Sequence, residues 1–165
     1  MRVYLPVTTA LLRGLVADGS IGTAPLTAFA VTPALREWYV DDDVEELEYA
    51  AMTEAARASL RLLSADAESA RRRAVVAADV ADDAVEIRDD LDRGVVRLSV
   101  PVQMADVASV HLDDSDAEEA VAAAVAAIDR ADLGDAEAQD RVDDVEGFEL
   151  SWYATQELDP LLELM

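Results

Sequence analysis

Short, predominantly apolar runs constrain the fold of this chain more than any other feature of its sequence. Three such runs are Val3–Val7, Leu26–Val31 and Ala74–Val80, of which the second contains Thr27 and the third contains Asp79. Each has the length of a β-strand and is too short for an amphipathic helix. In Leu26–Val31 the side chains of both faces are apolar, which indicates a strand covered on both sides. The runs therefore predict a sheet with helices packed against it.

The remaining elements follow from alternation and from helix caps. Val95–Val102 alternates between apolar and polar positions, which is typical of a strand near an edge. Two further strands are expected at Val107–Leu112 and Phe148–Ala154. Capping residues predict helices after Thr8 and Thr9 as far as Gly19, and over Thr32–Tyr39, Asp43–Leu63, Ser115–Arg130 and Asp135–Asp144.

This order of elements predicts the α/β class. A chain of 165 residues has the usual length of one domain, so we expect residues 1–165 to form a single α/β domain. Long connections between strands favour a mixed sheet of about six strands with helices packed against it. The alternative is a two-layer α+β arrangement.

The helix expected at Asp43–Leu63 has two apolar stripes. Each stripe is a set of residues that share one side of the helix: Val44, Leu47, Ala51, Ala55, Ala58 and Leu62 in the first, and Tyr49, Met52, Ala56, Leu60 and Leu63 in the second. Such a helix either lies between the sheet and a second helix or offers a surface for dimerisation. Glu48 falls between the stripes, so we expect it to be partly buried and to need a partner, for which an Arg is one candidate.

The charge of the chain is strongly negative. There are 36 acidic and 13 basic residues, a net charge of -23, and every basic residue is Arg. This acidity suits a salt-rich cytoplasm, high solubility or a surface for a basic protein partner. We expect no direct binding of nucleic acid, because this surface would repel the phosphates. No targeting segment or membrane span is visible, so we expect a cytoplasmic protein.

Several kinds of chemistry are excluded by composition. The chain has no Cys and a single His, His111, which excludes disulfides, thiolate metal sites and multi-histidine metal sites within one chain. It also lacks the glycine-rich nucleotide-binding motifs and the Gly-x-Ser-x-Gly nucleophile motif.

Polar residues at the ends of the expected strands suggest one enzymatic alternative. Asp79, Asp113 and Asp114 would hold a divalent cation, and His111 would act as the base with Asp113 orienting it on the same strand face. This requires mostly parallel strands, whose carboxyl ends gather at one edge. The competing interpretation is that these residues cap helices and form turns.

Aromatic residues suggest a recognition surface instead. Trp38, Tyr39, Trp152 and Tyr153 are candidates for an aromatic patch. Alternation in the last strand predicts that Phe148, Leu150 and Trp152 face the core, with Tyr153 on the other face. If that face is open, Tyr153 with Gln156 and Glu157 would form a binding surface; if a helix covers it, Tyr153 belongs to the core.

Four segments carry a resemblance to a known family. They are Leu26–Tyr39, Glu46–Ala51, Val110–Asp114 and Trp152–Leu158. Together they resemble a family of small actinobacterial proteins of unknown function. The resemblance spans nearly the whole chain and implies a bacterial cytoplasmic protein from a genome rich in G and C, but it implies no activity, cofactor or catalytic residue.

Two hypotheses about function follow. The first is a non-enzymatic interaction or regulatory protein without a cofactor, acting through its acidic surface or its aromatic patch. The alternative is a small metal-dependent enzyme acting on a phosphate-bearing substrate. Convergence of carboxylates on one point would favour the enzyme, and scattered acids would favour the binding protein. The oligomeric state stays open.

Overall fold

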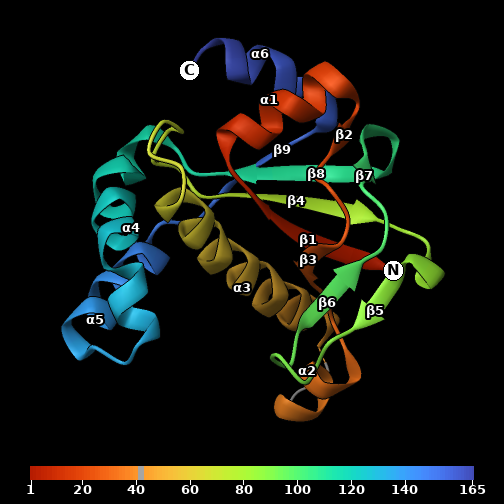
Figure 1. Cartoon of the computed structure of the whole chain (residues 1–165), viewed down its shortest axis with the longest axis horizontal. Helices are drawn as coiled ribbons and strands as arrows, with labels where there is room; N and C mark the ends of the chain where they lie inside the picture. Colours follow the sequence, from red (N-terminus) through yellow and green to blue (C-terminus); the bar gives the residue numbers. More distant parts are fainter. Residues whose placement is uncertain (41–42) are drawn as a thin grey trace.

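A seven-stranded sheet forms the centre of the protein (Figure 1). The structure, a computed structural model, describes residues 1–40 and 43–165. The strands of this sheet, in spatial order, are β5 (Val85–Ile87), β6 (Val95–Leu98), β3 (Leu26–Phe29), β1 (Arg2–Val7), β4 (Ala74–Asp79), β8 (Val107–Leu112) and β9 (Ser151–Tyr153). A separate pair is formed by β2 (Ser20–Ile21) and β7 (Val102–Gln103).

Six α-helices accompany the sheet in the described chain. They are α1 (Thr9–Asp18), α2 (Pro33–Trp38), α3 (Val44–Ser64), α4 (Glu118–Asp132), α5 (Ala136–Asp144) and α6 (Leu158–Glu163). The predicted α/β class is therefore confirmed. Thr8 caps α1 by accepting a hydrogen bond from Leu11 N, and Thr32 caps α2 by accepting one from Leu35 N. These contacts confirm the helix caps that the sequence predicts at both threonines.

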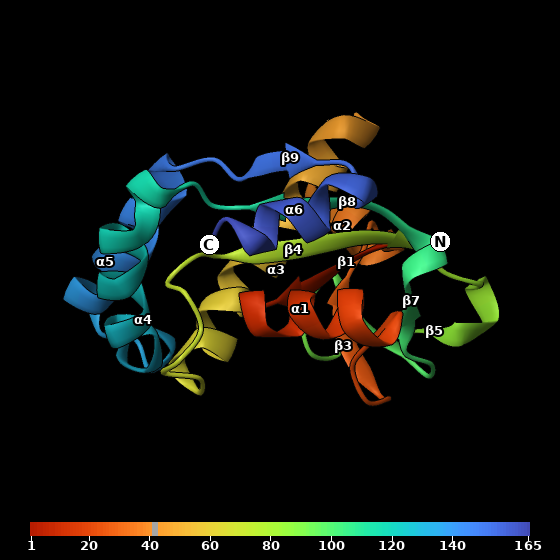
Figure 2. The ribbon, with the colours of Figure 1, turned by 90° about the horizontal axis from the view of Figure 1, so that it is seen from above.

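The two faces of the sheet are covered by different helices (Figures 1 and 2). Val3, Leu5 and Val7 of β1 pack with residues of α1 and α6 on one face. Tyr4 of the same strand packs on the other face, in one cluster with Leu47 and further apolar residues of α3. The period-two alternation of β1 thus supplies both cores, as expected for a strand covered on both sides.

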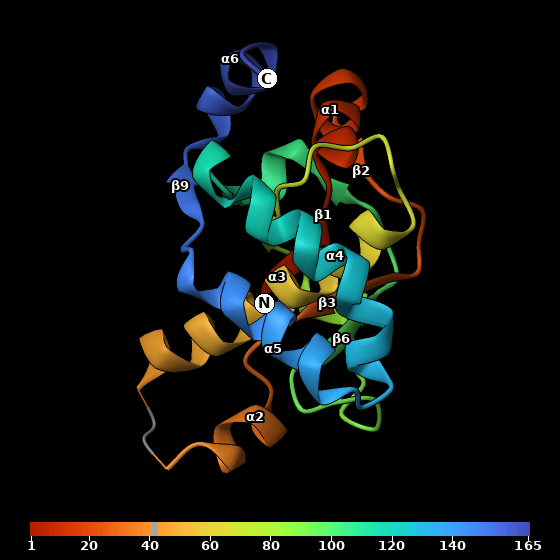
Figure 3. The same ribbon diagram turned by 90° about the vertical axis from the view of Figure 1, so that its left-hand side faces the viewer.

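The α4–α5 hairpin packs beside the C-terminal part of α3 (Figure 3). Leu60 and Leu63 of α3 join Val121 and Ile128 of α4 in a third apolar cluster. Packing against the sheet and against a second helix, one of the two alternatives that the sequence offers, therefore accounts for much of the two apolar stripes of α3. Some stripe residues are nevertheless exposed, among them Val44, Tyr49 and Leu62.

The strand directions differ from the expected mixed sheet. Every strand pair that the structure describes is antiparallel, including β1 with β4, β4 with β8 and β8 with β9. Periodicity locates a strand but does not reveal whether the connection to its neighbour crosses the sheet or returns to the same end. Here the neighbours run in opposite directions, so their carboxyl ends alternate between the two edges.

Candidate aromatic–acidic site

Three hollows border α3, and Tyr49 lines all three. The α2 groove, of about 770 Å³, lies between α3, α2 and the Asp92–Gly94 turn. The β9 groove, of about 290 Å³, lies between α3 and the part of the sheet at β8 and β9. The α5 cavity, of about 250 Å³, lies between α3 and the segment from α5 to Leu150. The α2 and β9 grooves also share Glu45, so they form one surface, the aromatic–acidic face.

The α2 groove combines aromatic rings with carboxylates. Trp38 is 61% exposed, and the guanidinium carbon of Arg93 lies 3.4 Å from the centroid of its ring. Thr32 Oγ1 donates a hydrogen bond to Arg93 O, which holds the turn against α2. The acidic residues that line the groove are Asp43, Glu45, Glu46, Glu54 and Asp92. The groove therefore offers both π surface and negative charge.

Electrostatic crowding is visible at Glu54. Desolvation by its surroundings raises the pKa of this carboxyl above its ordinary value, and the negative charge of Asp92 raises it further. Arg57 and Arg61 act in the opposite direction. A cation placed in this groove would relieve the repulsion between the two carboxylates.

The β9 groove is more mixed in character. His111 Nε2 and Ser109 Oγ are 3.0 Å apart, and Trp152, which is 60% exposed, pairs across the strands with His111. Burial lowers the pKa of His111, and the positive charge of Arg2 lowers it further. The imidazole is therefore held in its neutral form near pH 7.

Glu48 lies in the same groove and is partly buried, as its position between two apolar stripes predicts. Its carboxylate lies near the Tyr4 hydroxyl, and burial together with this negative charge raises the pKa of Tyr4 to about 12. An Arg partner was one candidate. The nearby Arg2 instead pairs with Asp79, at 2.7 Å from Nε to Oδ1, and only its charge reaches Glu48.

The predicted pairing of His111 with Asp113 is wrong. Asp113 follows β8 and turns into the protein, where its oxygens accept hydrogen bonds from Arg73 N, Nε and Nη2 at 2.7–2.8 Å. Its side chain is buried, because a doubly bonded guanidinium compensates its charge there. His111 is held by Ser109 instead. Because β8 ends at Leu112, Asp113 does not continue the alternation of the strand.

The carboxylates suggested as metal ligands do not converge. Asp79 ends β4 and Asp113 follows β8, and these two strands are antiparallel, so the two side chains belong to opposite edges of the sheet. Asp114 accepts from Ser151 Oγ at 2.7 Å and lies 3.5 Å from the Tyr153 hydroxyl. Across residues 1–40 and 43–165, no group of three or more His, Asp or Glu side chains could hold a metal ion.

The orientation expected for the last strand is reversed at its end. Trp152 is exposed on the α3 side, and Tyr153 packs partly against the core beneath α1 and α6. Gln156 and Glu157 are exposed in a 3₁₀ turn, where the Glu157 carboxylate accepts from Ala154 N. The strand begins only at Ser151, and Phe148 packs instead against the α4–α5 cluster, so alternation counted from Phe148 does not apply.

The aromatic patch is therefore partly reorganised. Trp38, Tyr39 and Trp152 lie on the aromatic–acidic face, whereas Tyr153 does not line it. Tyr49, which is 54% exposed, connects the two grooves and was assigned to an apolar stripe by periodicity. The sequence signal that could have indicated this role is the position of Tyr49 directly after Glu48, which the stripes predict to be partly buried.

The described helices include none that is both long and apolar enough to cross a membrane. Neither a curated protein nor a solved structure gives a significant match to the chain. The model of one family, described as a family of unknown function (DUF6912), matches residues 1–162. Because the match covers nearly the whole chain, the protein belongs to this family of unknown function.

Proposed function

We propose that the protein is a non-enzymatic interaction protein whose aromatic–acidic face binds a basic segment of a partner protein. The observation that carries this proposal is the position of Tyr49, at which an aromatic groove and a second groove meet with carboxylates along both. The alternative, a metal-dependent enzyme, lacks support because Asp79 and Asp113 end at opposite edges of the sheet.

Exposed aromatic side chains supply the contact area. Trp38, Tyr49 and Trp152 are each more than half exposed, and Tyr39 is exposed beside Trp38. Trp and Tyr are enriched at the energetic centres of protein interfaces, since their rings bury a large area and lose little conformational freedom. Single exposed aromatic residues scattered over a surface are normal, but four of them gathered along one helix and its borders indicate an interaction site.

The charge of the face indicates the kind of partner. Five carboxylates line the α2 groove, and Glu45 and Glu48 line the β9 groove. Arg93 stacks on Trp38 within the protein, because a guanidinium is attracted to the face of an indole. Exposed rings of this kind can bind the guanidinium groups of a partner in the same way. A partner with Arg side chains would gain both π contacts and charge pairing. With a net charge of -23, the protein would repel nucleic acid.

The setting proposed for this interaction is the cytoplasm of an actinobacterium. The composition supports it, since a chain without Cys needs no oxidising compartment for its fold. The resemblance of its segments to small actinobacterial proteins supports the proposed source.

The two Trp residues of the chain make a direct test possible, because Trp38 lies in one groove and Trp152 in the other. A synthetic peptide of alternating Arg and Leu is titrated into ¹⁵N-labelled protein at low salt. We expect both indole N–H signals to shift and the binding to weaken as salt is added. A peptide of alternating Glu and Leu serves as the control probe.

Matched variants identify the face. Glu45→Gln removes one carboxylate shared by the two grooves, and Glu119→Gln removes an exposed carboxylate of α4 that lines none of the three hollows described above. We expect only Glu45→Gln to weaken binding of the basic peptide. Unchanged indole signals, equal effects of the two variants, or equal binding of the acidic peptide would overturn the proposal.

A further inference from the structure

The α5 cavity contains a buried Arg that the aromatic–acidic face does not use. Arg73, immediately before β4, is only 5% exposed in its side chain and lines this cavity. Its guanidinium donates through Nε and Nη2 to Asp113, and through Nη2 to Phe148 O at 2.7 Å. In the part of the chain that the structure describes, none of the hydrogen bonds of Arg73 uses Nη1. A buried Arg with two free N–H groups is rare, since unpaired donors are costly.

The free nitrogen faces open space. Among the described side chains, the one fully enclosed polar atom without a partner is Thr9 Oγ1, so Arg73 Nη1 is not sealed inside the protein. The open space that Arg73 lines is the α5 cavity. Its two Nη1 N–H groups can therefore donate to an acceptor held there, and the bonds to Asp113 and Phe148 keep the guanidinium plane in a fixed orientation.

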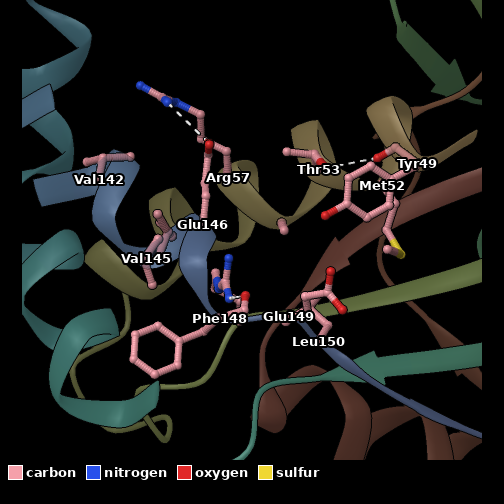
Figure 4. A pocket seen from close by; sticks show the side chains of 13 residues that line it. Tyr49, Met52, Thr53, Arg57, Val142, Val145, Glu146, Phe148, Glu149 and Leu150 are labelled. Atoms are coloured by element: carbon pink, nitrogen blue, oxygen red, sulfur yellow. Dashed lines mark hydrogen bonds and ion pairs between the residues drawn. The ribbon is translucent and has the colours of Figure 1, made fainter. Parts of the chain in front are cut away.

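The walls around this donor are mainly apolar (Figure 4). Phe148 and Val145 lie on one side, and Met52 of α3 lies on the other. Arg57 stands at the edge, where it pairs with Asp143 and Glu146 at 3.4 and 3.9 Å. The volume of about 250 Å³ is slightly below the usual range for drug-sized ligands, so it suits a small molecule.

The electrostatics favour a neutral ligand. Asp113 already compensates the charge of Arg73, so a ligand carboxylate would be a second anion on one guanidinium. Glu146 and Glu149 also line the cavity, and the whole protein carries a net charge of -23. A neutral carbonyl oxygen accepts the same hydrogen bonds without this repulsion.

We propose that the α5 cavity is a binding site for a small, mostly apolar molecule that carries a neutral carbonyl group, with the carbonyl oxygen accepting from Arg73 Nη1 and the apolar body lying against Phe148 and Val145. This site adjoins the proposed partner surface, because it shares Tyr49 and Thr53 with the α2 groove and Tyr49 and Met52 with the β9 groove. Arg73, Val145 and Phe148 line the α5 cavity and neither groove.

Benzamide and benzoate form a matched pair of probes, since they have nearly the same shape and differ in charge. Each is titrated into the labelled full-length protein, and backbone signals and the Arg73 Nε–H signal are followed by NMR. We expect benzamide to shift the signals of Arg73 and residues 142–150, and benzoate to bind at least about tenfold more weakly. Shifts at these positions locate the site without any substitution.

A variant that fills the cavity provides the second test. Ala56 lines the α5 cavity on α3, so Ala56→Leu should weaken benzamide binding by at least about tenfold. Ala126→Leu, at an exposed position of α4, is the matched control and should bind as the parent does. Benzoate binding as tightly as benzamide would overturn the neutral class of ligand. Absence of shifts at Arg73 and residues 142–150, or unchanged binding in folded Ala56→Leu, would overturn the site.

Discussion

At the scale of single residues, environment decides what each titratable side chain does. His111 and Asp113 are separated by one residue, yet one lies in the β9 groove beside Ser109 and the other lies in a buried pair with Arg73. The first is held neutral by burial and by the charge of Arg2, and the second has its charge compensated by a guanidinium.

The neutral state of His111 makes stability depend on pH. Its folded pKa is below the unfolded value of about 6.5, so protons bind the unfolded state more readily. Its contribution to stability is therefore complete above about pH 7 and decreases as the pH falls through the unfolded pKa toward the lower folded one. We expect wild-type protein to lose more stability than His111→Gln between pH 7 and pH 5, measured by urea unfolding. Equal pH slopes would contradict this, and the one His signal in NMR gives the pKa directly.

Glu48 gives a second prediction at this scale. Glu48→Gln keeps the size of the side chain but removes the charge that attracts Arg2, so we expect a loss of about 1 kcal/mol of stability. Glu46→Gln, at an exposed position of the same helix, should change stability much less. Denaturant titration of both variants measures the difference, and equal effects would show that the charge of Glu48 contributes no net stability.

At the scale of elements, α3 organises the molecule because it contacts the sheet, α4 and all three hollows. Ser59 joins this helix to the ends of two strands. Its hydroxyl donates to Val7 O at 2.7 Å and accepts from Ala74 N at 3.1 Å, and all three groups are buried. A polar residue in the middle of the apolar side of α3 thus satisfies backbone groups that the ladder between β1 and β4 leaves open.

Removing this hydroxyl should destabilise the fold. Ser59→Ala leaves Val7 O and Ala74 N without that partner in an enclosed site, so we expect a loss of about 1–3 kcal/mol. Ser64→Ala, at the exposed C-terminal residue of α3, is the matched control and should have little effect. Thermal unfolding of both variants measures this, and a loss no larger than that of the control would be inconsistent with the bridging role.

At the scale of the whole molecule, negative charge dominates. The ion pairs that link elements, such as Arg61 with Asp132 and Arg57 with Asp143, use several of the 13 basic residues and still leave a large excess of the 36 acids. Exposed pairs contribute little, whereas repulsion among the unpaired carboxylates acts over the whole surface.

Salt should therefore stabilise the protein. Raising NaCl from roughly 10 mM to roughly 300 mM shortens the Debye length from about 30 Å to below 10 Å, which screens repulsion between exposed carboxylates. We expect Tm to rise over this range in differential scanning calorimetry. A Tm that stays constant or falls would show that the carboxylates are already well separated. Sucrose at equal osmolality distinguishes screening from a general effect of cosolute.

The apolar runs and the caps were sufficient to locate most elements, because alternation and capping depend on neighbours along the chain. Val3–Val7, Leu26–Val31 and the caps at Thr8 and Thr32 all correspond to observed elements. Partial burial of Glu48 and the position of α3 between the sheet and a second helix also followed from periodicity. Local pattern thus determined the class of the fold and the sides of α3 that face inward.

Strand direction and the partners of polar residues were decided only by tertiary structure. Antiparallel pairing separates Asp79 from Asp113, and the buried guanidinium of Arg73 takes the carboxylate that the sequence offered to His111. Tyr49 joins the two grooves only because α2 and β9 approach α3 from different sides. These outcomes depend on which distant segments of the chain meet. The packing of the whole chain decides that, and local sequence patterns carry no information about it.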